Sequence, residues 1–355
     1  MIYRPRRLVI EEAVGGSPLV QRIRTALPDA AVSWVQRLSD EAAPGDGDVL
    51  EIVNFPGGFI KPCPGTRSYI CCGYQILHLG VQCSLGCTYC ILQAYFQNPN
   101  VRLFANLDDM WQQLEDHLRR SPRRVHRLGT GEFTDSLFLD PVTRMTKDLV
   151  PFFAEQPNAI LELKTKSSCV DLLENLEHRG NTIVAWSLNP PALIATEEPA
   201  AASLEERLRA AQRCQQWGYR LAFHFDPLIV YPGWRQGYAE VVHHLFSRVD
   251  PAGIAWVSLG TLRFMPSLKR IIRQRHPESA ILDEEFIPGL DGKLRYFRDL
   301  RVEMYRHLID LLRAGEKTLC VYLCMESDDI WGEALGFTPA ERGGLCAMLD
   351  RQALP

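Results

Sequence analysis

Residues 82–90 read QCSLGCTYC and place three cysteines, Cys83, Cys87 and Cys90, on one short loop with the spacing C-x3-C-x2-C. Three thiolates at this spacing can bind three irons of a four-iron cluster, which leaves the fourth iron without a protein ligand. An open metal position can bind a substrate or cofactor, as it does in catalytic zinc sites. Three reduced thiols that simply pack in a core are the alternative, but the glycine and threonine between them indicate a turn. We therefore expect a four-iron, four-sulfur (4Fe-4S) cluster on this loop.

The composition is that of a globular protein in a reducing compartment. The chain has 355 residues, of which 46% are hydrophobic, and this is enough for one large core or two moderate ones. The net charge of -4 gives no general case for nucleic-acid binding. The first residues form no apolar signal stretch, and no long apolar run occurs elsewhere. We therefore expect a cytoplasmic protein with no membrane partner and with reduced cysteines.

Apolar runs typical of strands alternate with helical patterns from residue 76 onward. Strands alternating with helices predict a parallel sheet with right-handed crossovers. Six such units are too few for a closed eight-stranded barrel, so we predict an α/β fold with a partial (β/α)6 barrel, open on one side. In such folds ligands bind at the C-terminal ends of the strands. The runs cover residues 76–81, 125–129, 159–165, 182–189, 221–227 and 254–260, and a last run covers 318–324.

The barrel has a region on either side of it. Residues 1–70 predict a small N-terminal α/β lobe, residues 71–262 the partial barrel, and residues 263–355 a C-terminal extension. The best-defined helix starts at Ser203, because Glu206 completes a capping box with it. Arg207, one turn into this helix, is expected on the surface.

The chain resembles the spore photoproduct lyase family of radical S-adenosylmethionine (SAM) enzymes. The cysteine spacing is that of the radical SAM superfamily. The closer likeness extends over roughly residues 70–337 and includes LKTKSSCVDLL, the strand ending SLN, SLEERLRAAQRCQQWGYRLAFHFDPLIVYPGW, DGKLRYFRDLRVEMYR and LCMESDDIWGEALG. The resemblance implies two cofactors, a 4Fe-4S cluster and SAM, and an external one-electron reductant such as flavodoxin or ferredoxin. It also implies that a 5′-deoxyadenosyl radical abstracts hydrogen from a methylene-bridged thymine dimer in DNA.

A lyase-type enzyme of DNA repair, acting on a thymine dimer or a related base lesion, is therefore the function that we favour. A radical SAM enzyme with a small-molecule or peptide substrate is a second reading, and a non-catalytic DNA-binding relative is a third. Reductive cleavage of SAM separates the enzymes from the binding protein. Salt-dependent affinity for DNA separates the first reading from the second.

Polar residues at the ends of the predicted strands are the candidates for SAM binding. The carboxylate of Glu132 can accept hydrogen bonds from the methionyl amine, and the glycines beside it allow close approach of the backbone. Lys166 aligns with a lysine that the family places near SAM. Short polar side chains after the fourth strand suit ribose hydroxyl or carboxylate contacts. The candidates are Gly129, Gly131, Glu132, Thr134, Lys166, Ser187 and Asn189.

Two basic segments are candidates for DNA contacts. Residues 263–276 contain no acidic residue and could neutralise phosphates, although a solvated surface explains them equally well. The stretch GKLRY, residues 292–296, falls where the family contacts the lesion, and a tyrosine beside two cations suits base stacking. The candidates are Arg263, Lys269, Arg270, Arg273, Lys293, Arg295 and Tyr296.

The chain departs from the family at its hydrogen donor. Characterised members carry a cysteine on the loop after the second strand and a tyrosine after the third cluster cysteine, which together return a hydrogen atom to the product radical. Here that loop has no cysteine and Ile91 follows the third cysteine, whereas Tyr89 is retained. Tyr89 and Tyr296 are the catalytic candidates. Without the usual hydrogen donor, we expect SAM to be consumed as a co-substrate. The alternative is that Cys324, Tyr231 or Tyr296 has taken over as the donor.

A second group of cysteines, Cys63, Cys71 and Cys72, precedes the first barrel strand. These thiols could ligate another metal together with a distant fourth ligand. The simpler interpretation, which we favour, is that they are small buried residues where the N-terminal lobe meets the barrel.

Overall fold

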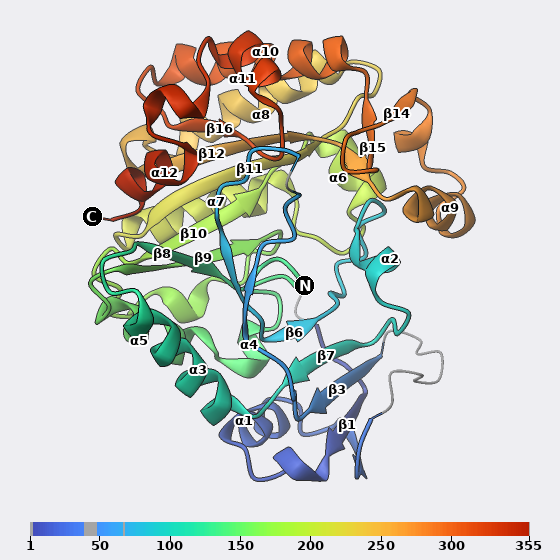
Figure 1. Cartoon of the computed structure of the whole chain (residues 1–355). Coiled ribbons are helices and arrows are strands. Elements are labelled where there is room, and N and C mark those ends of the chain that lie inside the picture. The colour runs from blue at the N-terminus through green and yellow to red at the C-terminus, as the bar shows by residue number, and fades with distance from the viewer. Residues whose placement is uncertain (1–2, 39–47, 67, 355) are drawn as a thin grey trace.

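An eight-stranded sheet forms the centre of the computed structural model, which describes residues 3–38, 48–66 and 68–354 (Figure 1). The strand order is β16-β12-β11-β10-β9-β8-β5-β4, and every neighbouring pair is parallel except β4 with β5. The sheet curls into a partial barrel, so the predicted fold class is confirmed. Its strands are β4 (Ile60–Pro62), β5 (Gln75–Leu77), β8 (His126–Gly129), β9 (Ala159–Thr165), β10 (Thr182–Ser187), β11 (Arg220–Leu228), β12 (Ile254–Thr261) and β16 (Val321–Leu323).

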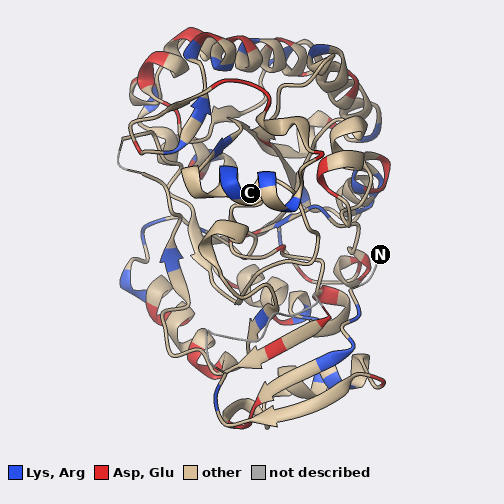
Figure 2. Ribbon diagram, turned by 90° about the vertical axis from the view of Figure 1, so that its right-hand side faces the viewer, with Lys and Arg blue, Asp and Glu red and all other residues tan. Residues whose placement is uncertain are grey.

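Helices cover the outer face of this main sheet. The predicted capping box is present, since Ser203 Oγ accepts from the backbone N–H of Glu206 and the Glu206 carboxylate accepts from that of Ser203. The helices along the barrel are α3 (Leu107–Arg120), α4 (Asp140–Thr143), α5 (Thr146–Ala154), α6 (Pro191–Glu197), α7 (Leu204–Gln216) and α8 (Trp234–Arg248). The last three are α10 (Arg298–Gly315), α11 (Asp328–Leu335) and α12 (Leu345–Ala353). Acidic and basic residues are interspersed over the outer helices (Figure 2).

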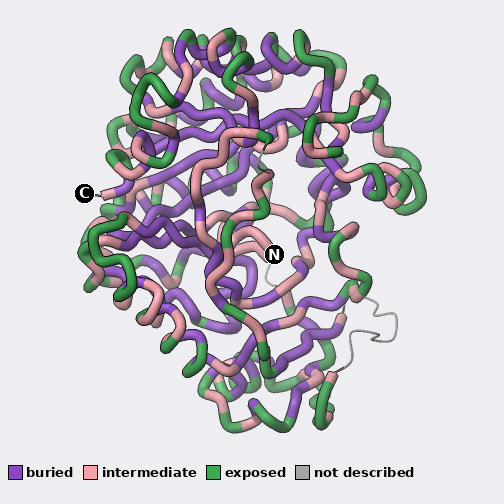
Figure 3. The backbone as a smooth tube through the Cα atoms, in the orientation of Figure 1, coloured by how far each residue is buried: buried purple, intermediate pink, exposed green. Residues whose placement is uncertain are grey.

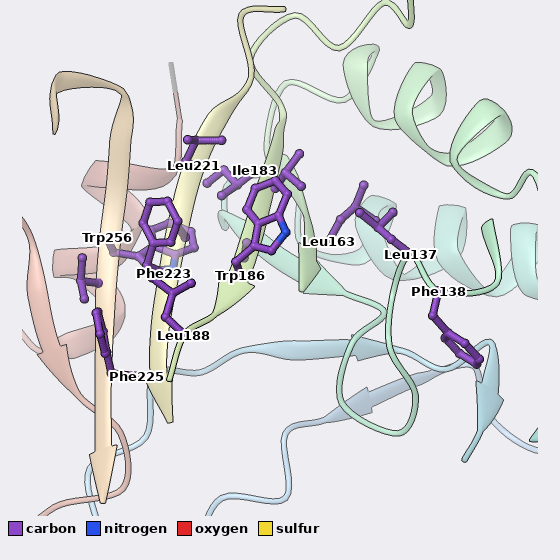
Figure 4. Close-up of a cluster of buried hydrophobic side chains, with 14 of the residues drawn as sticks. Leu137, Phe138, Leu163, Ile183, Trp186, Leu188, Leu221, Phe223, Phe225 and Trp256 are labelled. Atoms are coloured by element: carbon purple, nitrogen blue, oxygen red, sulfur yellow. The ribbon is translucent and has the colours of Figure 1, made fainter. Parts of the chain in front are cut away.

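Alternate residues of the main strands point to opposite faces of the sheet, and the two faces differ in polarity. On the helix side, Leu221, Phe223 and Phe225 of β11 are fully buried beside Trp186 of β10 (Figure 4). Figure 3 shows that the strands are buried along most of their length, whereas the outer helices alternate buried and exposed turns. The opposite face carries charged side chains and forms the wall of the site described below.

The N-terminal lobe contains a second sheet with the order β2-β1-β3-β7-β6. Helix α1 (Pro18–Ala26) begins at Ser17, whose side chain accepts from the backbone N–H of Leu19. This sheet takes two of its strands from residues 80–104, which lie within the segment expected to be barrel. Its strands are β1 (Arg7–Glu11), β2 (Ala31–Val35), β3 (Val49–Val53), β6 (Gly80–Val81) and β7 (Val101–Phe104). The lobe and the barrel are therefore interleaved in sequence.

The C-terminal region first forms a small separate sheet and then adds a last strand to the barrel. Three short strands form an antiparallel sheet with the order β13-β15-β14, and helix α9 (Pro266–Arg275) packs against α2 (Leu92–Tyr95). Strand β16 then joins the main sheet beside β12. The three strands of the small sheet are β13 (Arg263–Phe264), β14 (Phe286–Pro288) and β15 (Leu294–Tyr296). No helix among the described residues is long and apolar enough to span a membrane.

Candidate active site

A cavity of about 550 Å³ opens at the C-terminal ends of the main strands. This is the position where parallel α/β folds bind their ligands, and the volume suits a nucleoside-sized molecule. Its walls come from the loop of residues 82–100, which we call the cysteine loop, from the strand ends and from residues 63–74, 262–276 and 293–325. Lysine and arginine outnumber aspartate and glutamate along the wall, although the whole chain has a net charge of -4. The cavity therefore favours an anionic ligand.

Cys83, Cys87 and Cys90 all line this cavity. Gly86 has a φ of +67°, which allows the tight turn between the first two of them, and the backbone N–H of Cys90 donates to the carbonyl of Cys87 at 3.0 Å. Burial raises the pKa of the Cys87 thiol to about 12 and raises the pKa of Cys83 well above its ordinary value. Thiols in this state give up their protons when a metal binds.

The three thiols fit a four-iron cluster better than a single metal ion. Among the described residues, no three histidine, cysteine, aspartate or glutamate side chains gather closely enough to hold one ion. A four-iron cluster binds each cysteine through a different iron and therefore accepts thiols that lie farther apart. The three thiols nevertheless lie near one another. Cys87 and Cys90 are close enough to Cys83 for their charges to help raise its pKa.

The cysteine loop is closed by hydrogen bonds to the N-terminal lobe. Gln82 Nε2 donates to the carbonyl oxygen of Asn98 at 2.8 Å, which joins the two ends of the loop. The returning limb is held by Glu51 of β3, which accepts from Asn98 and Asn100 at 2.8–3.0 Å and from Arg102 at 2.7 Å. Because Glu51 is buried, these hydrogen bonds are shielded from water and hold the returning limb of the loop in place.

The loop after β8 brings some of the predicted cofactor residues to the cavity. Gly131, Glu132 and Thr134 line it, and the hydroxyl of Thr134 is buried without a hydrogen-bond partner. Glu132 Oε2 lies 3.3 Å from Lys164 Nζ. Gly129 does not line the cavity, since a Cβ there would lie 2.0 Å from the hydroxyl of Tyr74. The reason for glycine at 129 is therefore the close packing of Tyr74, not the approach of a ligand.

Of the other residues predicted to bind SAM, Lys166 and Ser187 line the cavity, but Asn189 does not. The amide of Asn189 donates to Tyr89 Oη at 3.2 Å and to Glu198 Oε1 at 2.9 Å, and it accepts from Tyr238 at 3.0 Å. Both N–H groups of the Asn189 amide are therefore used within the protein, away from the cavity. The side chain of Asn189 instead binds the hydroxyl of Tyr89 and holds that ring in place.

Tyr89 belongs to a buried ionic network that the sequence did not reveal. Its hydroxyl donates to Glu198, which is also ion-paired with Arg207, and both charged side chains are 0% exposed. The surface position expected for Arg207 is wrong. Burial would raise the pKa of Glu198, but Arg207 and Lys166 more than offset this and hold it below its ordinary value. A signal was present, because Arg207 lies at helical spacing between Leu204 and Leu208, on the apolar face of α7.

Charged residues on the concave side of β9 and β11 form the floor of the cavity. His224 Nε2 lies 2.7 Å from Glu162, and the guanidinium of Arg263 binds both carboxylate oxygens of Asp226 at 3.0–3.1 Å. Burial raises the pKa of Asp226, but Arg263 reverses this and lowers it overall. The signal was the period of two, since charged residues alternate with apolar ones within otherwise buried strands.

The predicted DNA-contact residues divide into three places. Arg263 and Lys293 line the cavity, and Arg270 and Arg273 are exposed on α9, where Lys269 lies 5.8 Å from the ring of Phe286. Arg275 of the same helix donates to Gln93 of the cysteine loop at 3.2 Å, so α9 lies beside the cavity.

Arg295 and Tyr296 do not face the cavity. Arg295 is 1% exposed, pairs with Asp291 at 2.8 Å and stacks on Tyr69. Tyr296 is 0% exposed and its hydroxyl accepts from the backbone of Val230. Base stacking by Tyr296 is not compatible with this arrangement, because the ring has no open face. Tyr95, which lines the cavity and is 40% exposed, is the better placed aromatic ring.

The partial barrel carries three cysteines with the spacing C-x3-C-x2-C beside the C-terminal ends of its strands. This combination defines a radical SAM-type α/β protein. The family model described as spore photoproduct lyase matches residues 68–292, and the chain belongs to this family. Spore photoproduct lyase of Geobacillus sp. (strain Y412MC61) is 30% identical over 210 residues, which are 58% of this chain and 62% of the relative. The protein of the same name from Clostridium acetobutylicum is 22% identical over 205 residues, 57% and 61% of the two chains. The matched region thus spans about six tenths of each curated relative.

Solved structures agree in fold. A spore photoproduct lyase complexed with dinucleoside spore photoproduct has a TM-score of 0.80 at 21% identity and covers 91% of this chain and 100% of its own. A double mutant with bound AdoMet and the same dinucleoside has a TM-score of 0.80 at 22% identity, with the same coverage. At these identities the likeness establishes the partial barrel and its N-terminal lobe.

Proposed function

We propose that this protein is a radical SAM enzyme that acts on a methylene-bridged thymine dimer, or a closely related base lesion, in DNA. The observation that carries the proposal is that Cys83, Cys87 and Cys90 share one cationic cavity with the polar ends of the barrel strands. Family membership adds the reaction class. When bound, the reduced cluster and SAM would supply a 5′-deoxyadenosyl radical.

The residues of this chain that line the cavity divide the work of binding. The three loop thiols would hold the cluster, with the fourth iron left open for the cofactor. Glu132 and Lys166 suit the amine and carboxylate of SAM, because they offer the opposite charge to each group. Ser187 supplies a hydroxyl for the nucleoside part. The Glu198–Arg207 pair binds Tyr89 and so anchors the cysteine loop to the barrel.

Phosphate and base recognition would come from the open side of the cavity. Arg275 and Lys293 line the wall and offer cations to a dinucleotide phosphate, whereas the charge of Arg263 on the same wall is paired with Asp226. Exposed Arg270 and Arg273 extend this charge along α9 toward the flanking duplex. Tyr95 at the cavity edge can stack on a base. This local charge favours DNA over an uncharged small molecule or a peptide.

The test uses anaerobically reconstituted protein, SAM, a one-electron reductant and DNA that carries the dimer. We expect about four irons per chain, release of 5′-deoxyadenosine and conversion of the dimer to thymines. A triple variant with alanine at Cys83, Cys87 and Cys90 loses iron and both products. Cys169→Ala is the matched control, because Cys169 lies outside the cavity wall and this variant should retain all three readouts.

Two results would contradict the proposal. SAM cleavage by the triple variant would place the cluster elsewhere. SAM cleavage by the unaltered protein with no change in the dimer, and no affinity for DNA at low salt, would favour a small-molecule or peptide substrate.

A further inference from the structure

Thiols lie on the cavity wall away from the cysteine loop. Cys63, Cys72 and Cys324 line the same cavity as the cluster cysteines. Cys324 directly follows β16, so its side chain lies at the C-terminal end of a barrel strand, where a bound substrate is expected. The loop after β8, residues 130–139, contains no cysteine. The thiols at 63, 72 and 324 are therefore the cavity thiols outside the cysteine loop.

The sulfur of Cys324 is held in place by charged neighbours. Arg263 Nη2 donates to Cys324 Sγ at 3.3 Å, and the same guanidinium is bound to Asp226. Asp226 therefore fixes the guanidinium that contacts the sulfur of Cys324. Burial raises the pKa of Cys324 to about 12, so the sulfur keeps its proton at neutral pH. A neutral thiol is the form that can donate a hydrogen atom.

The other candidate donors are placed less well. The hydroxyl of Tyr296 is buried against the backbone of Val230, and neither Tyr296 nor Tyr231 lines the cavity. Cys63 and Cys72 lie between β4 and β5, at the antiparallel edge of the main sheet, and neither follows a parallel strand as Cys324 does. Cys324 is thus the cavity thiol fixed by side chains of the substrate-facing wall.

We propose that Cys324 is the hydrogen-atom donor to the substrate-derived radical, an inference that rests on the proposed function. The S–H bond of Cys324 breaks homolytically, and its hydrogen atom forms a C–H bond on the thymine-derived radical. One thiyl radical remains on Cys324. A low-molecular-weight thiol that enters the cavity returns a hydrogen atom to this sulfur, and two such oxidised thiols combine as a disulfide. The S–H proton exchanges with water that enters the cavity, so it is solvent hydrogen.

The first test measures the position of Cys324 without turnover. Reconstituted protein is treated with methyl methanethiosulfonate, with and without the dinucleotide thymidylyl-thymidine, and each cysteine is followed by mass spectrometry. We expect saturating dinucleotide to slow modification of Cys324 by about tenfold, since the ligand would cover it. Exposed Cys346 is the internal control and should react at an unchanged rate. Equal modification of Cys324 with and without dinucleotide would overturn the proposal.

The second test measures the hydrogen atom itself. Turnover in deuterated water should place one solvent deuterium per repaired dimer, in one of its two thymines. In Cys324→Ser the product should fall by about tenfold or more while 5′-deoxyadenosine release continues, because serine offers no comparable donor. Cys320→Ala is the matched control, since Cys320 precedes β16 and lies outside the cavity wall. Unchanged product and deuterium in Cys324→Ser would refute the role.

The two proposals fail in different ways. An unaltered protein that cleaves no SAM, or leaves the dimer intact, counts against the proposed function. Repair by the unaltered protein without solvent deuterium counts against Cys324 alone. The modification experiment needs neither SAM cleavage nor repair, so it decides whether Cys324 faces the bound dinucleotide in either case.

Discussion

Replacing Arg207 by methionine should destabilise the protein far more than replacing an exposed arginine of the same helix. Arg207 donates to Glu198 and to the backbone carbonyls of Ser187 and Ala202 at 2.8–2.9 Å, and it is 0% exposed. Methionine fills much of the same volume but provides no charge and no donor. The substitution therefore leaves a carboxylate buried without its strongest partner, which typically costs about 3–5 kcal/mol.

Protonation of Glu198 limits only the part of this cost that comes from its unpaired charge. Glu198 can escape as a neutral acid, and protonating a carboxyl of ordinary pKa 4.5 at pH 7 requires about 3.4 kcal/mol. At pH 5 the same escape requires only about 0.7 kcal/mol. The unaltered pair is stable across this window because the folded-state pKa of Glu198 is lowered, so its contribution is lost only as pH falls below the ordinary value. The destabilisation by Arg207→Met should thus shrink by up to about 2.7 kcal/mol between pH 7 and pH 5.

Urea unfolding under anaerobic, reducing conditions, followed by tryptophan fluorescence, measures these differences. Arg209→Met is the matched control on α7, because Arg209 is 60% exposed and its pair with Glu205 should contribute less than about 1 kcal/mol. Glu198→Gln is a second control, since it leaves no carboxyl to protonate and should show no recovery at pH 5. Equal costs for Arg207→Met and Arg209→Met, or a cost independent of pH, would refute the argument.

Other predictions address the cavity and α9. Gly129→Ala should reduce the yield of folded protein, because a Cβ there meets the hydroxyl of Tyr74 and the backbone of Glu162, and thermal denaturation would show the loss. Lowering pH through the depressed pKa of Asp226 should remove the stabilisation that its pair with Arg263 provides, so that acid unfolding begins at higher pH in Asp226→Asn. Each turnover should release about one 5′-deoxyadenosine, counted by mass spectrometry, if SAM is a co-substrate. Replacing the α9 cations by glutamine should weaken duplex binding and reduce its dependence on salt by about one unit of slope per lost phosphate contact, as measured by anisotropy. Those cations are Lys269, Arg270 and Arg273.

The barrel could be predicted from sequence because its strands are short apolar runs with helices between them. The cysteine spacing likewise predicted which loop reaches the cavity, and Glu132, Thr134, Lys166 and Ser187 were found there. The apolar runs and the cysteine spacing are local patterns, so they can be recognised without knowledge of tertiary contacts. Because all the parallel strands end at the same edge of the sheet, the loops that follow them meet there.

The errors have a common physical origin, which is that a polar residue near a strand end can face a ligand or another part of the protein. Asn189 and Tyr296 both follow strands or lie in them, yet their polar groups are taken by Glu198 and by Val230. Their partners are distant in sequence, so no local pattern reveals them. The floor of the cavity was missed for the opposite reason. Glu162 and His224 lie inside strands that read as apolar, and only their alternation marks them as facing inward.

The interleaving of the two sheets ties the placement of Cys83, Cys87 and Cys90 to the folding of the N-terminal lobe. The loop that carries these thiols leaves β6 and returns through β7, and these strands pair directly, with Gly80 opposite Leu103. Strand β7 rests in turn on β3, whose Glu51 holds the returning limb. A fragment that began at the barrel would keep all three loop cysteines and lose the strands that set their spacing. The lobe thus sets the spacing of the three loop cysteines. If they bind the proposed cluster, a chain cut at residue 70 should bind iron poorly even when its barrel folds.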